Sequence, residues 1–178
     1  MWQGESLYPA DHPMKRTFKH VNIYPTNEFP FGRKGYTLTR LWETAKESHT
    51  QGMLILDGDV AIDPIDFDVM YRAMRSAPTA IHIGPARIWP VSTGYSTSVW
   101  AHRKFGTSFA EWQEFRTEVD TASFCFTYLP ATLINGCISN GMENWTYPNV
   151  DKTVFEHARK MEIRFHVVDG CMPKHMHY

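Results

Sequence analysis

The amino-acid sequence predicts an α/β fold, with a mostly parallel sheet flanked by helices, in a single domain that spans residues 1–178. Apolar runs of strand length alternate along the chain with segments whose apolar residues recur at helical spacing. No repeat, linker or charge block divides the chain. With 43% hydrophobic and 21% charged residues, a chain of 178 residues can build one core, which excludes a disordered or fibrous protein.

Five elements are predicted in the first half of the chain. β-branched and aromatic residues that end at Pro25 indicate a strand. The spacing of Leu38, Leu41, Trp42 and Ala45 indicates a helix that reaches about Ser48, and Pro64 fits the first turn of a second helix. In order, we expect strand 17–24, the helix from Leu38, strand 53–56, helix 65–77 and strand 79–83.

The second half begins with a long segment without clear periodicity. Residues 84–106 are rich in Gly, Pro, Ser and Thr, and a loop of this length is typical of a binding loop or a lid. The elements expected after it are a short helix at 109–116, a strand at 121–128, helices at 130–140 and 151–160, and a strand at 163–168. A polar tail rich in histidine follows.

Charge and cysteine content narrow the classes of partner and compartment. The net charge of −1 provides no overall basic field for a nucleic-acid backbone. The most apolar run, residues 53–56, is too short for a transmembrane segment, and the start of the chain does not resemble a secretory signal. Three cysteines without a CxxC pair argue against a disulfide framework. We therefore expect a soluble, cytoplasmic protein.

An acidic pair gives the clearest indication of chemistry. Residues 54–60 read LILDGDV, so Asp57 and Asp59 follow the end of a buried strand, where ligands bind in open α/β sheets. Carboxylates so close together favour a divalent cation such as Mg²⁺ or Mn²⁺, with Gly58 allowing a close turn around it. The alternative is a polar turn in which one Asp caps local backbone.

Two further segments carry candidate side chains. In the tail, Cys171, His175 and His177 could bind zinc, could be surface residues, or could supply one imidazole to the cation at Asp57 and Asp59. Asp151 opens a helix, where it serves as a cap or first-turn carboxylate, and a carboxylate fixed beside a cleft can also accept a proton. Aromatic side chains could stack on a sugar or fill the core; they are Trp89, Tyr95, Trp100 and Trp145.

The order of these pieces resembles nucleotide-sugar-dependent glycosyltransferases of the GT-A fold. The resemblance covers about residues 32–178 and rests on GRKGY, LILDGDV, NVDKTVFEHAR, IRFHVV and a late histidine. It implies a minimal Rossmann-like domain, a nucleotide-sugar donor, a hydroxyl acceptor and a divalent cation. Asp57 and Asp59 would hold the cation on the donor diphosphate with His175 or His177, Lys34 would lie at the donor, and Asp151 would be the base of an inverting transfer.

The chain departs from that family in two respects. Only about fifty residues precede the acidic pair, and one strand is assigned there, whereas the family usually places two strand–helix units ahead of it. Val150 also stands where a Glu–Asp pair is common. The nucleoside pocket is therefore expected to be abbreviated or to be built differently.

Two other functions stay open. LILDGDV is also similar to the DxD strand of haloacid-dehalogenase-type phosphatases, in which Asp57 would be the nucleophile, but Ala61 stands where that family has Thr or Val. The short region before Asp57 instead favours a catalytically degenerate domain that binds a sugar or a partner. The chain also has six Trp and eleven Phe, enough large apolar side chains for an interface in a homo-oligomer.

Overall fold

A computed structural model describes residues 33–46, 50–58, 60–91, 94–97, 99–101, 104–105, 119–146 and 149–175. Its centre is a sheet of four strands in the order β1 (Gly52–Leu56), β9 (Phe126–Pro130), β3 (Ile81–Ile83) and β10 (Phe165–Val167). The fold is α/β, as predicted. The strand at 17–24 and the helix at 109–116 that the sequence predicts lie outside the described residues.

The prediction of a mostly parallel, Rossmann-like sheet is wrong. β9 pairs antiparallel with both β1 and β3, and only β10 and β3 pair in parallel. The reason lies in the connection from β3 to β9, whose two ends meet at one edge, since the Gly84 amide donates to the Phe126 carbonyl at 2.8 Å. Two strands joined by a connection run parallel only when the connection returns to the opposite end of the strands. This connection instead joins neighbouring strand ends.

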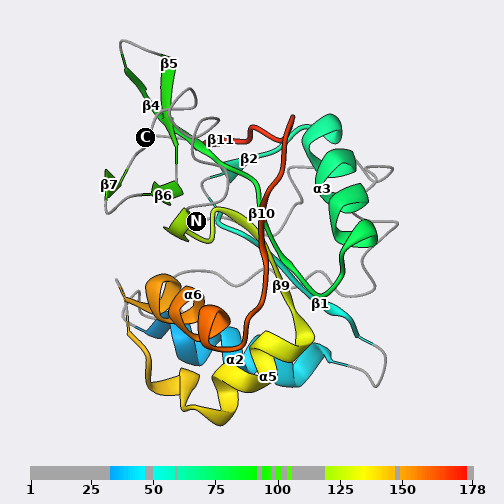
Figure 1. Cartoon of the computed structure of the whole chain (residues 1–178), viewed down its shortest axis with the longest axis vertical. Helices are drawn as coiled ribbons and strands as arrows, with labels where there is room; N and C mark the ends of the chain where they lie inside the picture. The colour runs from blue at the N-terminus through cyan, green and yellow to red at the C-terminus, as the bar shows by residue number, and fades with distance from the viewer. Residues whose placement is uncertain are drawn as a thin grey trace, which may run out of the picture.

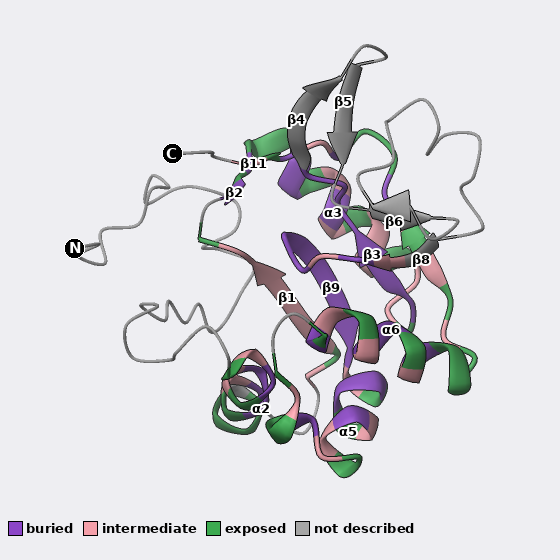
Figure 2. Cartoon of the chain, turned by 90° about the vertical axis from the view of Figure 1, so that its left-hand side faces the viewer, coloured by how far each residue is buried: buried purple, intermediate pink, exposed green. Residues whose placement is uncertain are grey.

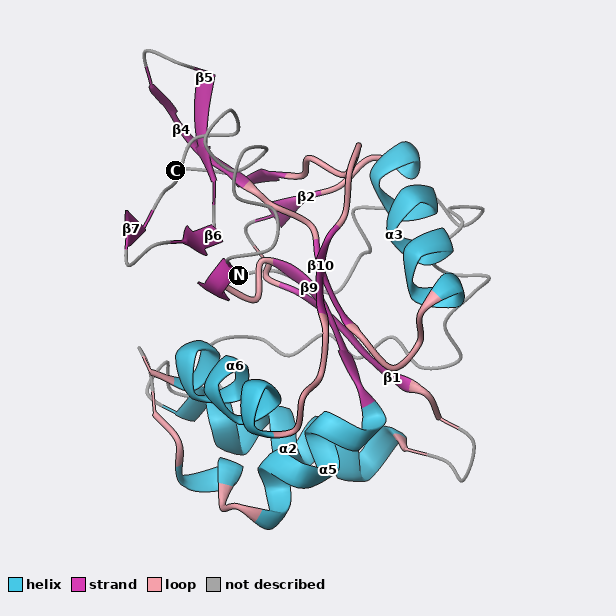
Figure 3. Ribbon diagram, viewed as in Figure 1, coloured by secondary structure: helices cyan, strands magenta, loops and turns pink. Residues whose placement is uncertain are grey.

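Helices cover both faces of this sheet (Figures 1 and 3). α3 (Pro64–Ser76) lies on one face, and α2 (Lys34–Ala45), α5 (Ala131–Ser139) and α6 (Val150–Lys160) lie on the other. Side chains of β1 alternate accordingly, since Met53 and Ile55 pack against the cluster beneath α2, α5 and α6, whereas Leu54 and Leu56 pack against the cluster beneath α3. The buried strands between two helical layers are visible in Figure 2.

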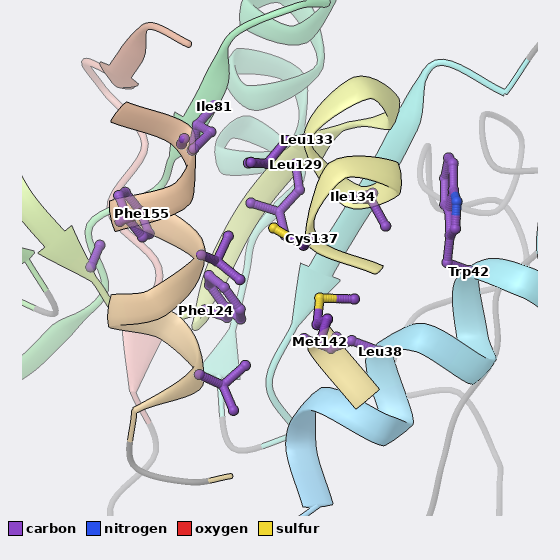
Figure 4. Packing of buried hydrophobic residues seen from close by; sticks show 14 of the residues in the cluster. Leu38, Trp42, Ile81, Phe124, Leu129, Leu133, Ile134, Cys137, Met142 and Phe155 are labelled. Carbon is purple, nitrogen blue, oxygen red and sulfur yellow. The ribbon is translucent and has the colours of Figure 1, made fainter. Parts of the chain in front are cut away.

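The larger apolar cluster joins three helices to the sheet. It includes Trp42 of α2, Leu133 of α5 and Phe155 of α6, together with Met142 of the short 3-10 helix η2 (Met142–Asn144). Figure 4 shows Leu133, Leu129 and Phe124 between α5 and α6, Met142 beside Leu38, and Trp42 at the far end of the cluster. This packing fixes the starts of α2 and α6 relative to the sheet.

Short strands form two smaller sheets. One has the order β2 (Val60–Ala61), β11 (Lys174–His175), β4 (Arg87–Val91) and β5 (Gly94–Thr97); the other joins β7 (Lys104–Phe105), β6 (Val99–Ala101) and β8 (Val119–Ala122). The loop predicted at 84–106 is therefore largely paired strand. The single strand predicted at 121–128 is divided between β8 and β9. Strands this short do not show a clear period of two in sequence.

Four of the five predicted helices are confirmed, and the fifth, at 109–116, lies outside the described residues. α3, α5 and α6 begin and end within one residue of the predicted limits, and α2 begins at Lys34, four residues before the predicted start at Leu38. The predicted strands at 53–56, 79–83 and 163–168 correspond to β1, β3 and β10.

Candidate functional site

Strand directions in the central sheet bring chemically active residues to one edge. β1, β3 and β10 run in one direction because β9 is antiparallel to both of its neighbours. The carboxyl end of β1 therefore lies beside the start of β9, where the Asp57 amide donates to the Cys125 carbonyl at 3.1 Å. Asp57 is half-buried there, at the type of edge where α/β proteins bind ligands.

An ion pair at the same edge links α2 to α6. Lys34 Nζ lies 3.1 Å from Oδ1 and 3.3 Å from Oδ2 of Asp151, and the Phe124 amide donates to that Oδ2 at 3.2 Å. The ammonium group also lies 5.0 Å from the centre of the Phe124 ring. Asp151 is thus a first-turn residue of α6 whose carboxylate bonds to α2 and to the segment before β9. No sequence pattern predicts the Lys34–Asp151 pair or the role of the Phe124 amide.

The electrostatics join Asp57 to this pair. Burial lowers the pKa of Lys34, but the charges of Asp57 and Asp151 and the hydrogen bond to Asp151 raise it, and the net pKa is above its ordinary value. Burial raises the pKa of Asp151, and the charge of Asp57 adds to this; together they outweigh Lys34 and the Phe124 amide, so the net pKa is also raised. Lys34 and Asp151 therefore both hold their protons more tightly than they would in water.

Close contact between α2 and η2 explains how Lys34 reaches the edge. The Gly35 amide donates to the Trp145 carbonyl at 3.2 Å. A Cβ at position 35 would lie 2.1 Å from the Met142 carbonyl oxygen, so only glycine allows this approach. The first residue of α2 is in this way held against the loop that leads to α6.

The tail returns to the acidic turn. β11 pairs antiparallel with β2, with His175 opposite Val60 and Lys174 opposite Ala61. β2 follows the acidic turn directly, and the Val60 amide closes that turn by donating to the Asp57 carbonyl at 3.1 Å. A Cβ added at Gly58 would meet no atom of the described residues within 4 Å. His175 is half-buried beside it.

Two of the expected ligands, Asp59 and His177, lie outside the described residues. Among the residues that the structure describes, no three His, Cys, Asp or Glu side chains are grouped so that they could hold a metal ion by themselves. Cys171 is fully buried in the cluster beneath α3, and burial, with Asp66 and Asp63 nearby, raises the pKa of its thiol. Both features disfavour Cys171 as a zinc ligand, because a thiolate is the binding form.

The four aromatic candidates divide into two groups. Trp89, Tyr95 and Trp100 belong to β4, β5 and β6, but their side chains lie outside the described part of the structure. Trp145 is half-buried, packs against the cluster beneath α2, α5 and α6, and has its ring centre 6.5 Å from that of His157. These contacts favour a core role for Trp145.

No protein-family model and no curated protein matches this chain. Within the described residues, no helix has the length and apolar character needed to cross a membrane.

Proposed function

We propose that the protein is a metal-dependent glycosyltransferase, which moves a sugar from a nucleotide-sugar donor to a hydroxyl acceptor. One observation carries the proposal: Lys34, Asp57 and Asp151, far apart in sequence, interact at a single sheet edge. The pairing of β11 with β2 supports it, because this pairing brings His175 beside the same acidic turn. The three cysteines are buried and none of them forms a disulfide in the described part of the chain, which suits a cytoplasmic location.

The chemistry of the residues present fits a divalent cation. Two carboxylates and one ammonium group carry a net charge of −1, and the charge of Asp57 acts to raise the pKa of both Lys34 and Asp151. Carboxylate oxygens and an imidazole nitrogen are suitable ligands for Mn²⁺. Asp57 and Asp59 would hold the cation together with His175 or His177. Once bound, it would act as a Lewis acid on the donor diphosphate.

The other side chains have complementary tasks. The Lys34 ammonium would bind diphosphate oxygen. Asp151 would accept the proton of the acceptor hydroxyl. As the proton leaves, the hydroxyl oxygen would form a bond to the anomeric carbon, and the bond between that carbon and the diphosphate oxygen would break. Burial keeps the Asp151 pKa above its ordinary value, which makes the carboxylate a stronger base, and the Phe124 amide fixes one of its oxygens. Attack opposite the leaving group inverts the anomeric configuration.

Thermal unfolding with nucleoside diphosphates and nucleotide sugars, with and without Mn²⁺, tests this function. A ligand at a hundred times its dissociation constant stabilises the folded state by about 2.7 kcal/mol. We expect one nucleotide to raise the melting temperature only with Mn²⁺, and Asp59→Asn to abolish the effect. Asp68→Asn is the matched control, since Asp68 is exposed on α3. A full effect in Asp59→Asn would contradict the proposed cation site.

A second variant separates binding from catalysis. Asp151→Asn should keep Mn²⁺-dependent donor binding and lose sugar transfer, because an amide cannot accept the proton of the hydroxyl. Unchanged transfer in this variant would show that the base is another residue.

A sugar-binding domain without activity is the second candidate, and the Lys34–Asp151 ion pair favours it. A carboxylate held at 3.1 Å by an ammonium group is less available to accept a proton. Donor binding by the wild type without transfer to any acceptor tested would support this candidate over the enzyme.

A further inference from the structure

The segment that carries His175 to the acidic turn is held at few points. After β10, the Val168 amide donates to the Ile83 carbonyl at 2.8 Å, and Cys171 is buried beneath α3. β11 itself pairs with β2 through two residues and with β4 through Lys174 alone. Pairings this short contribute little by themselves, so the position of His175 depends on an anchor before β11.

Asp66 provides that anchor from the first turn of α3. Its side chain is buried, with 8% of the residue exposed. Oδ1 accepts the Met172 amide at 2.7 Å, and Oδ2 accepts the Asp63 amide at 3.3 Å as part of a capping box. The capping box needs only one of these oxygens. The other oxygen makes a short, charge-assisted hydrogen bond to the tail, three residues before His175.

We propose that Asp66 is a positioning residue for the cation site: by holding Met172, its carboxylate keeps β11 on β2 and His175 beside the acidic turn. This inference rests on the proposed function. Asp66 acts on the cation site through the tail. Because cation binding through His175 requires a docked tail, cation binding and tail docking stabilise each other.

The experiment compares Asp66→Asn with Asp68→Asn, which makes the same charge change at an exposed position of the same helix. An asparagine side chain has one acceptor oxygen, so either the Met172 or the Asp63 amide loses its partner. In Asp66→Asn we expect hydrogen exchange at the Met172, Lys174 and His175 amides to accelerate at least about tenfold. With nucleoside diphosphate present, the Mn²⁺ dissociation constant should rise about tenfold. Asp68→Asn should change neither quantity.

The outcomes separate this inference from the proposed function. Mn²⁺-dependent nucleotide binding in the wild type, with the same Mn²⁺ affinity in Asp66→Asn, overturns the role of Asp66 alone. If the wild type binds no nucleotide with Mn²⁺, both proposals fail, whatever the exchange rates are.

A measurement on the wild type covers the case in which Asp66→Asn does not fold. Saturating Mn²⁺ and nucleoside diphosphate should slow exchange at the Met172, Lys174 and His175 amides, because a bound cation holds the tail in place. Unchanged exchange at these three amides, under conditions in which the nucleotide binds, overturns the inference.

Discussion

The Lys34 side chain balances two carboxylates at the edge of the central sheet. Its ammonium group pairs with Asp151, and the charge of Asp57 raises its pKa. The sequence placed Lys34, Asp57 and Asp151 in separate motifs and predicted that they serve one site. It could not predict the ion pair, because a distance between residues 117 positions apart depends on how helices pack.

Replacing Lys34 tests how strongly this charge balance stabilises the fold. Lys34→Met leaves the Asp151 carboxylate half-buried without its cation, and we expect a loss of about 1–3 kcal/mol in the free energy of unfolding. This is less than the 3–5 kcal/mol of a fully buried pair, because the two side chains are 22% and 19% exposed. Chemical denaturation measures the loss. Adding Asp151→Asn should recover part of it, whereas additive losses would show that the pair does not interact.

Among whole elements, the placement of α2 depends on Gly35. The sequence identified this helix from the spacing of Leu38 and Trp42, since helical periodicity is a local property. Its start could not be predicted, because the Gly35 amide bonds to Trp145, from a segment beyond α5. The direction of β9 was missed for a related reason. An apolar strand reads the same in either direction, and its orientation is set by the connection before it.

Gly35→Ala should move α2 as a unit. The added methyl group would lie 2.1 Å from the Met142 carbonyl oxygen and 2.6 Å from the Trp145 carbonyl oxygen, and both are backbone atoms. We expect a destabilisation of about 1–3 kcal/mol, measured by chemical denaturation, because overpacking forces the backbone to shift. The variant should also weaken Mn²⁺-dependent nucleotide binding, since Lys34 precedes the glycine.

Thr37→Ala is a matched control for Gly35→Ala. Thr37 is a half-buried residue of the same helix. Its hydroxyl donates an exposed hydrogen bond to the Arg33 carbonyl at 3.1 Å. We expect a small change in stability and unchanged nucleotide binding. Equal losses in the two variants would show that the contact between α2 and η2 does not position the site.

For the molecule as a whole, the alternation of strand and helix patterns correctly predicted an α/β protein, and interacting charges lie at the predicted place, the carboxyl end of β1. The sequence did not predict the strands between Arg87 and Phe105, because strands of two to five residues do not show a clear period of two. The core was easier to predict, because the residues that line the two helical layers are those with helical or strand periodicity.

The same core determines how global stability responds to alkali. Burial raises the pKa of Tyr128 to about 12 from 10.0 and that of Cys137 to about 12 from 9.0. Below pH 9.0 both groups are protonated in the folded and unfolded states, so their contribution is complete. As the pH rises, the unfolded chain loses these protons first. The free energy of unfolding therefore falls between pH 9.0 and about 12.

Cys137→Ala removes one of these two titrating groups and so tests its share of the pH dependence. The thiol is fully buried, so the variant loses about 1 kcal/mol at neutral pH through the small cavity that it leaves. Above pH 9.0, the free energy of unfolding should decline less steeply in the variant than in the wild type, by up to about 1.4 kcal/mol per pH unit. Denaturation at a series of pH values measures both slopes. Parallel slopes would mean that the Cys137 thiol ionises as readily in the folded protein as in the unfolded chain, which would contradict its place in the core beneath α5.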